Sequence, residues 1–234
     1  MHRNTLITDP RLTALGVLHG TTLRRHGDMK VPAERELFLK EQNIPSERIL
    51  LLHQVHSTIA PEIFTQSDFD RYNRRPRHSA DGWILGGDIT GVGAAVYSAD
   101  CAPVFMWDKK ADMVAVLHCG WRGTVAGFAG IAARRMKDLG AKGPISAFIA
   151  AHIEPCCFEI GPEVAAKFNP ASLTEKKGTI YANITHELTL QLEAAGLNRA
   201  DIAAHGECTR CSNDKYHSFR RTGKTSAMLS YILL

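Results

Sequence analysis

The segment from Asp81 to Cys119 carries four short apolar runs separated by turn residues, and this pattern constrains the fold more than any other feature of the chain. Each run has the length of a buried β-strand, and none approaches the ~20 residues that a membrane-spanning helix needs. The polar stretch DKKAD has the composition of a hairpin turn between the last two runs. The four runs are Asp81–Leu85, Gly91–Ser98, Pro103–Trp107 and Met113–Leu117. We therefore predict four strands that belong to a sheet.

Apolar runs and helical periodicity elsewhere in the chain predict the remaining elements. Further strands are expected at Leu12–Gly20, Ile49–His53, Ile145–Ala150, Asp201–Gly206 and Ser226–Leu234, and helices at Val31–Ile44, Val125–Leu139, Pro162–Phe168 and Asn183–Ala195. The polar, arginine-rich segment Ser67–Ser79 is predicted to be a loop. Because strands outnumber helices and do not alternate strictly with them, we predict an α+β fold with mixed sheets in layers. No Gly-, Ser- or Pro-rich linker divides the chain, so residues 1–234 are expected to form a single domain.

The composition is that of an ordinary globular protein with a mild net charge of +4. The basic cluster Arg71–Arg77 has no aromatic platform or reading helix beside it, so no nucleic-acid partner is expected. No apolar leader segment opens the sequence, and a cytoplasmic location without membrane attachment is therefore expected. In that compartment the six cysteines are more often reduced, metal-binding or catalytic than joined in disulfides.

Three metal-binding residue types follow buried strands, where the rigid backbone can bring their side chains together. They are His56, Cys101 and His118. Two histidines and one cysteinate form a plausible three-ligand zinc set with a fourth position left for water or substrate, and zinc in such a site lowers the pKa of its water to about 7. The alternative is that each histidine is a hydrogen-bonded structural residue and that the cysteine fills the core. The residues alone leave both interpretations open.

Five motifs distributed over the chain resemble one known family. They are QVHS, ADCAPV, HCGWRGT, EPCCFEIG and the C-terminal pair ECT and SFRR, in this order. They are similar to motifs of the bacterial laccase-domain family, whose members are described as multicopper polyphenol oxidase-like proteins, purine nucleoside phosphorylases or peptidoglycan editing factors. The resemblance implies a layered α/β/β/α sandwich with mixed sheets, like that of cytotoxic necrotizing factor. It also implies that His56, Cys101 and His118 are the ligands of one metal ion.

The resemblance further implies a metal-dependent enzyme of purine nucleosides. Family members are assigned phosphorolysis of adenosine, inosine and methylthioadenosine, and deamination of adenosine. The expected partners are therefore a purine nucleoside and phosphate, and the expected metal is zinc, with copper as an alternative. The oligomeric state stays open between monomer and homodimer. Several segments depart from the family pattern, among them YHSFRR near the C-terminus, and leave the preferred nucleoside open.

Residues around the implied metal receive roles through the same motifs. Cys101, His118 and Asp81 are the catalytic candidates, and Asp81 could orient a metal-bound histidine, act as a general base or simply form a turn. Three arginines are candidates for phosphate or substrate binding. They are Arg24, Arg122 and Arg220. Two of them, Arg24 and Arg220, could equally be surface charge, and Arg122 could be a helix-terminus arginine that packs on Trp121. Asp100 is expected to be structural, because strand alternation turns it away from Cys101.

Other functions fit the same residues. Cys101 could be a nucleophile with His118 as its base, in a cysteine hydrolase that acts on an amide of a cell-wall precursor. Copper-dependent phenol oxidation is less compatible with the sequence, because a multicopper oxidase needs paired histidine motifs. A metal-stabilised binding or editing protein without catalytic activity is the remaining alternative.

The other four cysteines outside the core are not expected to bind a second metal. Cys208 and Cys211 form a C-x-x-C pair, but a zinc ribbon needs a second pair with similar spacing. Cys156 and Cys157 are adjacent instead. Cys119, next to His118, is expected to pack in the core.

Overall fold

The fold consists of two large mixed sheets packed face to face, with helices on both outer faces. The structure is a computed structural model, and it describes residues 6–74, 77–110, 112–212 and 214–234. The strands are β1 (His19–Thr21), β2 (Ile49–Leu51), β3 (Glu62–Ile63), β4 (Gly82–Gly86), β5 (Gly93–Ser98), β6 (Ala102–Trp107), β7 (Met113–Cys119), β8 (Ser146–Ile149), β9 (Glu159–Ile160), β10 (Leu173–Lys176), β11 (Thr179–Ala182), β12 (Ile202–Ala204) and β13 (Met228–Leu233). The helices are α1 (Pro10–Ala14), α2 (Pro32–Glu41), α3 (Gln66–Tyr72), α4 (Trp121–Val125), α5 (Phe128–Asp138), α6 (Pro162–Ala165), α7 (Ile184–Ala194) and α8 (Phe219–Thr222).

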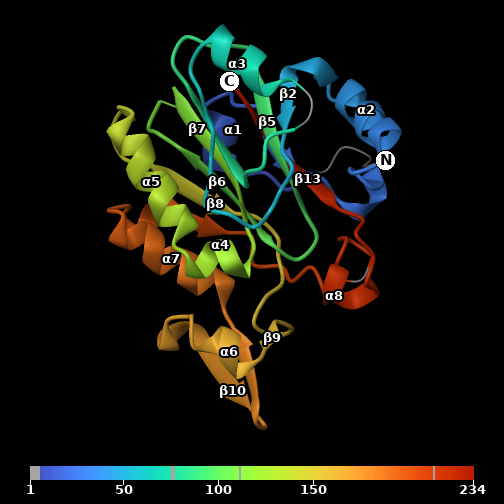
Figure 1. The fold of residues 1–234 in the computed structure, drawn as a ribbon, viewed down its shortest axis with the longest axis vertical. Helices are drawn as coiled ribbons and strands as arrows, with labels where there is room; N and C mark the ends of the chain where they lie inside the picture. Colours follow the sequence, from blue (N-terminus) through green and yellow to red (C-terminus); the bar gives the residue numbers. More distant parts are fainter. Residues whose placement is uncertain (1–5, 75–76, 111, 213) are drawn as a thin grey trace.

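Both large sheets contain parallel and antiparallel pairs, as the sequence predicts. One sheet has the order β12-β8-β6-β7-β4-β3, and the other has the order β1-β13-β5-β2. In the first sheet β12 pairs with β8 and β3 with β4 in parallel, while the remaining pairs are antiparallel. In the second sheet β2 pairs with β5 in parallel. A small third sheet, β10-β11-β9, lies with α6 at one end of the molecule (Figure 1).

The layer order is helix, sheet, sheet, helix. The strands of the two central layers are therefore buried on both faces. Along β7, Val114 and Val116 belong to the core between the two sheets, whereas Ala115 and Leu117 belong to the core beneath α5 and α7. Strand side chains alternate between the two faces, so a strand covered on both sides reads as one continuous apolar run. Helix α2 covers the outer face of the four-stranded sheet, on the opposite side of the molecule from α5 and α7 (Figure 1).

The predicted strand Leu12–Gly20 was wrong over most of its length. Asp9 is the N-cap of α1 and its carboxylate accepts a hydrogen bond from Arg11 N, with Pro10 at the first helical position. An aspartate followed by a proline is a helix-start signal, and it outweighs the apolar pattern of the next residues. The short strand β1 begins only at His19.

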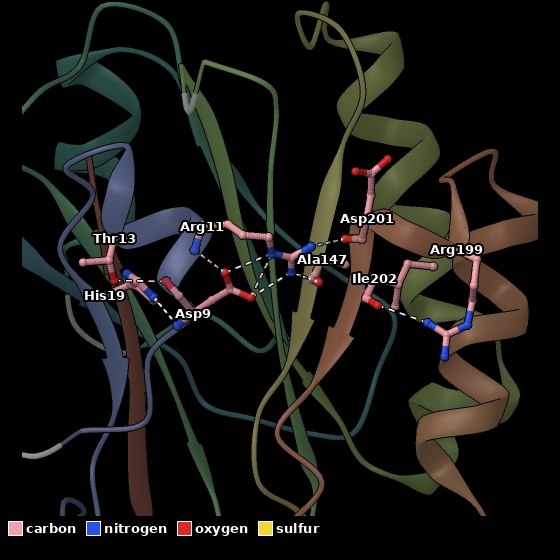
Figure 2. A network of polar contacts seen from close by, with 8 residues as sticks. All are labelled: Asp9, Arg11, Thr13, His19, Ala147, Arg199, Asp201 and Ile202. Atoms are coloured by element: carbon pink, nitrogen blue, oxygen red, sulfur yellow. Dashed lines mark hydrogen bonds and ion pairs between the residues drawn. The ribbon is translucent and has the colours of Figure 1, made fainter.

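The N-terminal helix also ties the two large sheets together through a polar network. The guanidinium of Arg11 pairs with Asp9 and donates hydrogen bonds to Ala147 O in β8 and to Asp201 O next to β12, both at 2.9 Å (Figure 2). His19 Nε2 in β1 accepts a hydrogen bond from Asp9 N at 2.9 Å. Because Asp9 is buried, its charge is compensated by this arginine and by the cap bond.

Two further predictions differ from the structure in part. The expected loop Ser67–Ser79 contains the helix α3, which Thr65 and Asp68 start with a reciprocal capping box, while Arg75 and Pro76 lie outside the described residues. The helix expected at Val125–Leu139 is α5, which begins only after Gly127, whose φ of 79° is left-handed, and the short helix α4 before it was not predicted. The predicted hairpin is confirmed by the antiparallel pairing of β6 with β7, although Ala111 of its turn is not described. Within the described ranges, no helix is long and apolar enough to cross a membrane.

Candidate metal centre

The ends of three strands bring His56, Cys101 and His118 to one place. His118 is the penultimate residue of β7, and Cys101 lies in the short connection between β5 and β6. His56 follows β2, and the side chain of Gln54 holds this segment against β5 by accepting a hydrogen bond from Tyr97 N at 2.7 Å and donating one to Tyr97 O at 2.8 Å. This paired contact continues the β2–β5 ladder beyond the last residue of β2 and fixes the position of His56.

The three candidate ligand atoms all lie within 4.8 Å of one another. Cys101 Sγ is 4.0 Å from His56 Nε2, and the two imidazole rings have their centroids 5.0 Å apart at 68°. Ligands bound to one tetrahedral zinc ion at 2.0–2.3 Å are separated by about 3.3–3.8 Å. The structure therefore places the three donors close to the separation that one ion requires.

A hydrogen bond to Asp81 fixes the orientation of the His118 ring. Asp81 Oδ1 accepts a hydrogen bond from His118 Nδ1 at 2.9 Å, so once His118 is neutral, as a metal ligand must be, Nε2 is the nitrogen with the free lone pair. Its Oδ2 accepts hydrogen bonds from Ser57 N, Ser57 Oγ and Val55 N. One fully buried carboxylate therefore holds two of the three ligand segments in register.

The charges of the centre are strongly coupled. Burial alone would raise the pKa of Asp81, but hydrogen bonds from His118 and Ser57 outweigh it and lower this pKa to about 2. Burial would also raise the pKa of Cys101, yet His118 and His56 lower it to about 6. Burial would lower the pKa of His118, but the Cys101 thiolate and Asp81 raise it to about 9. Without a metal, the centre is thus a thiolate–imidazolium pair at neutral pH.

Gly120 leaves room beside the side chains of His56 and Cys101. A Cβ atom at this position would be 2.7 Å from His56 Cδ2 and 3.1 Å from Cys101 Sγ. The φ of Gly120 is −69°, which any residue can adopt, so the glycine serves space and not backbone conformation. The soft donor set, the oriented imidazole and this space together fit a metal ion.

His56 adopts a backbone conformation that is unusual for its residue type. Its φ is 60°, in the left-handed region, where a residue with a Cβ costs of the order of 1–3 kcal/mol. The neighbouring N–H groups of Val55 and Ser57 donate to Asp81 and hold this conformation in place. Backbone strain of this kind gathers at functional sites, because the surrounding structure must over-determine it.

A cavity of about 680 Å³ opens beside the three ligands. This volume lies in the range of pockets that bind small molecules. The wall contains the aromatic rings of Trp121, Phe158 and Phe219, and the basic side chains of Lys30, Arg77 and Arg220.

The candidate substrate-binding arginines differ in position. Arg220 lines the cavity, with its guanidinium 5.2 Å from the Phe158 ring centroid and a hydrogen bond from Nη1 to Glu159 O at 3.0 Å. In the described part of the chain, Arg24 and Arg122 are not among the lining residues. The guanidinium of Arg122 instead stacks on Trp121 at 4.4 Å. Asp100 also lines the cavity, and its carboxylate accepts hydrogen bonds from Thr209 Oγ1 and Arg220 N.

Cys101 is expected to react as a thiolate in metal-free protein. Its alkylation rate with iodoacetamide should rise through pH 6 and be nearly constant from pH 7 to 8, because the thiolate fraction follows a pKa of about 6. Peptide mapping by mass spectrometry measures this rate for each cysteine. Cys119 is an internal control, since burial raises its pKa far above the ordinary value and it should stay unmodified. A midpoint at or above pH 8 for Cys101 would contradict the ion pair.

Three contributions to the centre were not anticipated from the sequence. Gln54 and Ser57 lie within the QVHS motif, and Gly120 within HCGWRGT, so the motifs marked the segments but not the roles. The spacing of the other cysteines in the sequence also gave no sign that four of them come together. The sulfurs of Cys156, Cys157, Cys208 and Cys211 lie within 4.8 Å of one another, because the fold brings the adjacent pair against the C-x-x-C turn. Cys119 is fully buried in the core beneath α5.

Comparison of the sequence with known protein families finds one matching family. The model of the family of multi-copper polyphenol oxidoreductase laccases matches residues 22–234. The chain therefore belongs to this laccase-domain family, as its motifs indicate.

Characterised relatives of the chain carry names of purine nucleoside enzymes. It is 31% identical to a purine nucleoside phosphorylase of Clostridium acetobutylicum, over 65% of this chain and 66% of the relative. It is 33% identical to the adenosine deaminase RL5 of an unknown prokaryotic organism, over 59% of this chain and 56% of the relative. A purine nucleoside phosphorylase of Streptomyces coelicolor is 31% identical over 87% and 82% of the two chains. The match thus spans less than two thirds of the length of the first two relatives and most of the third.

A solved structure confirms the fold. The crystal structure of YlmD from Geobacillus stearothermophilus superposes with a TM-score of 0.85 at 26% identity and covers 96% of this chain and 93% of that one. The layered arrangement with mixed sheets is therefore shared with this protein.

Proposed function

We propose that the protein is a zinc-dependent enzyme of purine nucleosides, which cleaves adenosine, inosine and methylthioadenosine with phosphate and also deaminates adenosine. The observation that carries this proposal is the set of His56, Cys101 and His118 beside a cavity with aromatic and basic walls. The names of the relatives support the substrate class. Membership of the family supports a metal-dependent centre.

The donor set favours zinc as the metal. Two imidazole nitrogens and one thiolate are the ligands of open catalytic zinc sites, in which the fourth position is left for water or substrate. A bound zinc ion would supply Lewis acidity, which polarises an oxygen of the substrate or of water. His56, Cys101 and His118 would hold it. Asp81 would act as a positioning residue, because it is ionised, fully buried and committed to hydrogen bonds with His118 and Ser57.

The cavity walls suit the two halves of the proposed substrate pair. A purine ring can stack on the exposed rings at the wall, among which Phe219 has 52% of its surface exposed. Arg220, Arg77 and Lys30 present positive charge that matches phosphate, and a guanidinium can bind two phosphate oxygens at once. The wall therefore offers both aromatic surface for the base and positive charge for the anion.

The direct test is an activity assay on protein of defined metal content. Zinc-loaded protein is incubated with adenosine, with and without phosphate, and products are separated by chromatography. We expect adenine and ribose 1-phosphate only when phosphate is present, inosine without it, and loss of both after chelation with recovery on adding zinc. Zinc-bound protein that converts none of adenosine, inosine and methylthioadenosine would contradict the proposal. Arg220→Ala should raise the KM for phosphate, whereas Arg122→Ala, a change outside the cavity wall, should not.

A second candidate function is favoured by the charge state of Cys101. Its lowered pKa and its partner His118 are the features of a cysteine nucleophile with an adjacent base. Such an enzyme would hydrolyse an amide, for example in a cell-wall precursor. Amide hydrolysis that survives chelation and is lost in proportion to alkylation of Cys101 would favour this function over the zinc-dependent one.

A further inference from the structure

Four cysteines that do not belong to the first centre come together between the loop before β9 and the turn after β12. Cys156 and Cys157 lie in the loop, and Cys208 and Cys211 lie in the turn. Cys211 Sγ is 3.4 Å from Cys156 Sγ and 3.2 Å from Cys157 Sγ, and all four sulfurs are within 4.8 Å of one another. None of these contacts is a disulfide, whose sulfurs would be about 2.05 Å apart.

The spacing of the sulfurs matches that of ligands on a single ion. Four thiolates bound to zinc at 2.3 Å in tetrahedral geometry lie about 3.8 Å apart. The two shortest contacts are 3.2 and 3.4 Å and no pair of sulfurs is more than 4.8 Å apart, so small side-chain adjustments bring all four sulfurs to one centre. Four soft thiolates in a tetrahedral arrangement select zinc or iron over the hard cations.

Hydrogen bonds around the cluster join its two segments, and one of them reaches a sulfur. Glu154 N donates a hydrogen bond to Cys208 Sγ at 3.4 Å, and a charged sulfur accepts such bonds better than a neutral thiol. His152 and Cys208 form an isolated parallel bridge, and Thr209 N donates to His152 O at 2.9 Å. Arg210 Nη1 donates to Cys157 O at 3.3 Å. The two segments are therefore joined at several points around the sulfurs.

We propose that Cys156, Cys157, Cys208 and Cys211 form a second metal site, which binds zinc through four thiolates and has a structural role. A site with four protein ligands has no position left for substrate, so it stabilises structure and does not take part in the reaction. The proposal does not depend on the nucleoside activity, since it rests on residues outside the first centre.

The bound ion would fix one wall of the large cavity. Phe158 directly follows Cys157 and Ile153 precedes the loop, and both line the cavity. On the other segment, the hydroxyl of Thr209 donates to Asp100 at 2.6 Å, next to Cys101. Clamping the loop to the turn thus restrains residues on two sides of the cavity.

The zinc content of matched variants tests the proposal. The background is Cys101→Ser, which removes a ligand of the first centre, so that remaining zinc reports on the second. Purified under reducing conditions, loaded with zinc and desalted, this protein should keep about one zinc per chain. Adding Cys211→Ser should reduce the content to near zero. Adding Cys119→Ala, at a buried cysteine outside both clusters, should leave it unchanged.

Two further readouts make the result independent of how well a variant folds. Cobalt(II) bound to the Cys101→Ser protein should give the sulfur charge-transfer bands of a thiolate-rich site. The unfolding midpoint of this protein should fall on chelation, whereas that of Cys101→Ser/Cys211→Ser should not change. Reduced Cys101→Ser protein that retains no zinc, or that retains the same amount with and without Cys211, would overturn the proposal. A disulfide among the four cysteines of protein purified under reducing conditions would overturn it too.

Discussion

Replacing Asp81 with asparagine is expected to weaken zinc binding about 10- to 100-fold and to lower any zinc-dependent activity by at least as much. The three hydrogen bonds from Ser57 and Val55 require an oxygen, so the new amide would turn its oxygen towards them and its NH2 group towards His118. His118 Nδ1 would then have to accept a hydrogen bond, and the proton would move to Nε2, the nitrogen that faces Cys101. In this tautomer Nε2 has no free lone pair for a metal, and Nδ1 is occupied by the amide. Competition with a chromophoric chelator measures the affinity.

The control for this substitution is Asp108, another buried aspartate that accepts hydrogen bonds from the backbone. Asp108 is 1% exposed and accepts hydrogen bonds from the backbone of Asp112 and Lys142, away from the three ligands. Asp108→Asn should cost folding stability, about 1–3 kcal/mol, and leave zinc affinity unchanged. If Asp81→Asn bound zinc as tightly as the wild type, the tautomer argument would be wrong.

Replacing Gly120 with alanine is expected to weaken zinc binding roughly 10- to 100-fold, without a matching loss of fold. The new Cβ would lie 2.7 Å from His56 Cδ2 and 3.1 Å from Cys101 Sγ, so both ligands must move away from the ion. Overpacking of this kind costs ~1–3 kcal/mol, and 1.4 kcal/mol corresponds to a factor of ten in affinity. Isothermal titration of the metal-free protein with zinc measures the change.

Gly161→Ala is the matched control for Gly120→Ala. Both glycines are N-caps of short helices, with φ of −69° for Gly120 and −78° for Gly161, so loss of the cap glycine affects both variants alike. At Gly161 the nearest atoms belong to the flexible end of Glu163, which can move aside. Equal zinc affinities in the two variants would show that Gly120 does not shape the metal site.

Much of the fold could be predicted because the central strands are recognisable from the pattern of neighbouring residues. The runs that became β4, β5, β6 and β7 are buried on both faces, and this gives a continuous apolar pattern between turns. The helix over Asn183–Ala195 has its start and end signals in the sequence, and the structure has α7 at Ile184–Ala194. These elements follow from short-range patterns that need no knowledge of the rest of the chain.

Two parts of the fold were not predicted correctly: the first helix, where short-range signals compete, and the small third sheet. The apolar residues of Leu12–Gly20 favour a strand, but Asp9 and Pro10 start a helix there, and Arg11 is then held by partners in β8 and near β12 (Figure 2). The third sheet, β10-β11-β9, gave no comparable signal, since its strands are short and partly exposed. A local helix-start signal decided the first case, and weak apolar patterning decided the second.

The sequence by itself determined the order of the central strands along the chain, the placing of His56, Cys101 and His118 after such strands, and, through its motifs, the family. The tertiary structure alone decided which groups meet: Asp81 with His118, the space at Gly120, and four cysteines in one cluster. The physical reason is that burial and periodicity are read from neighbouring residues, whereas a ligand set depends on contacts between segments far apart in the chain. The cysteines show the difference most clearly. An adjacent pair and a C-x-x-C pair match no zinc-binding pattern in the sequence, and yet their four sulfurs lie within 4.8 Å of one another in the structure.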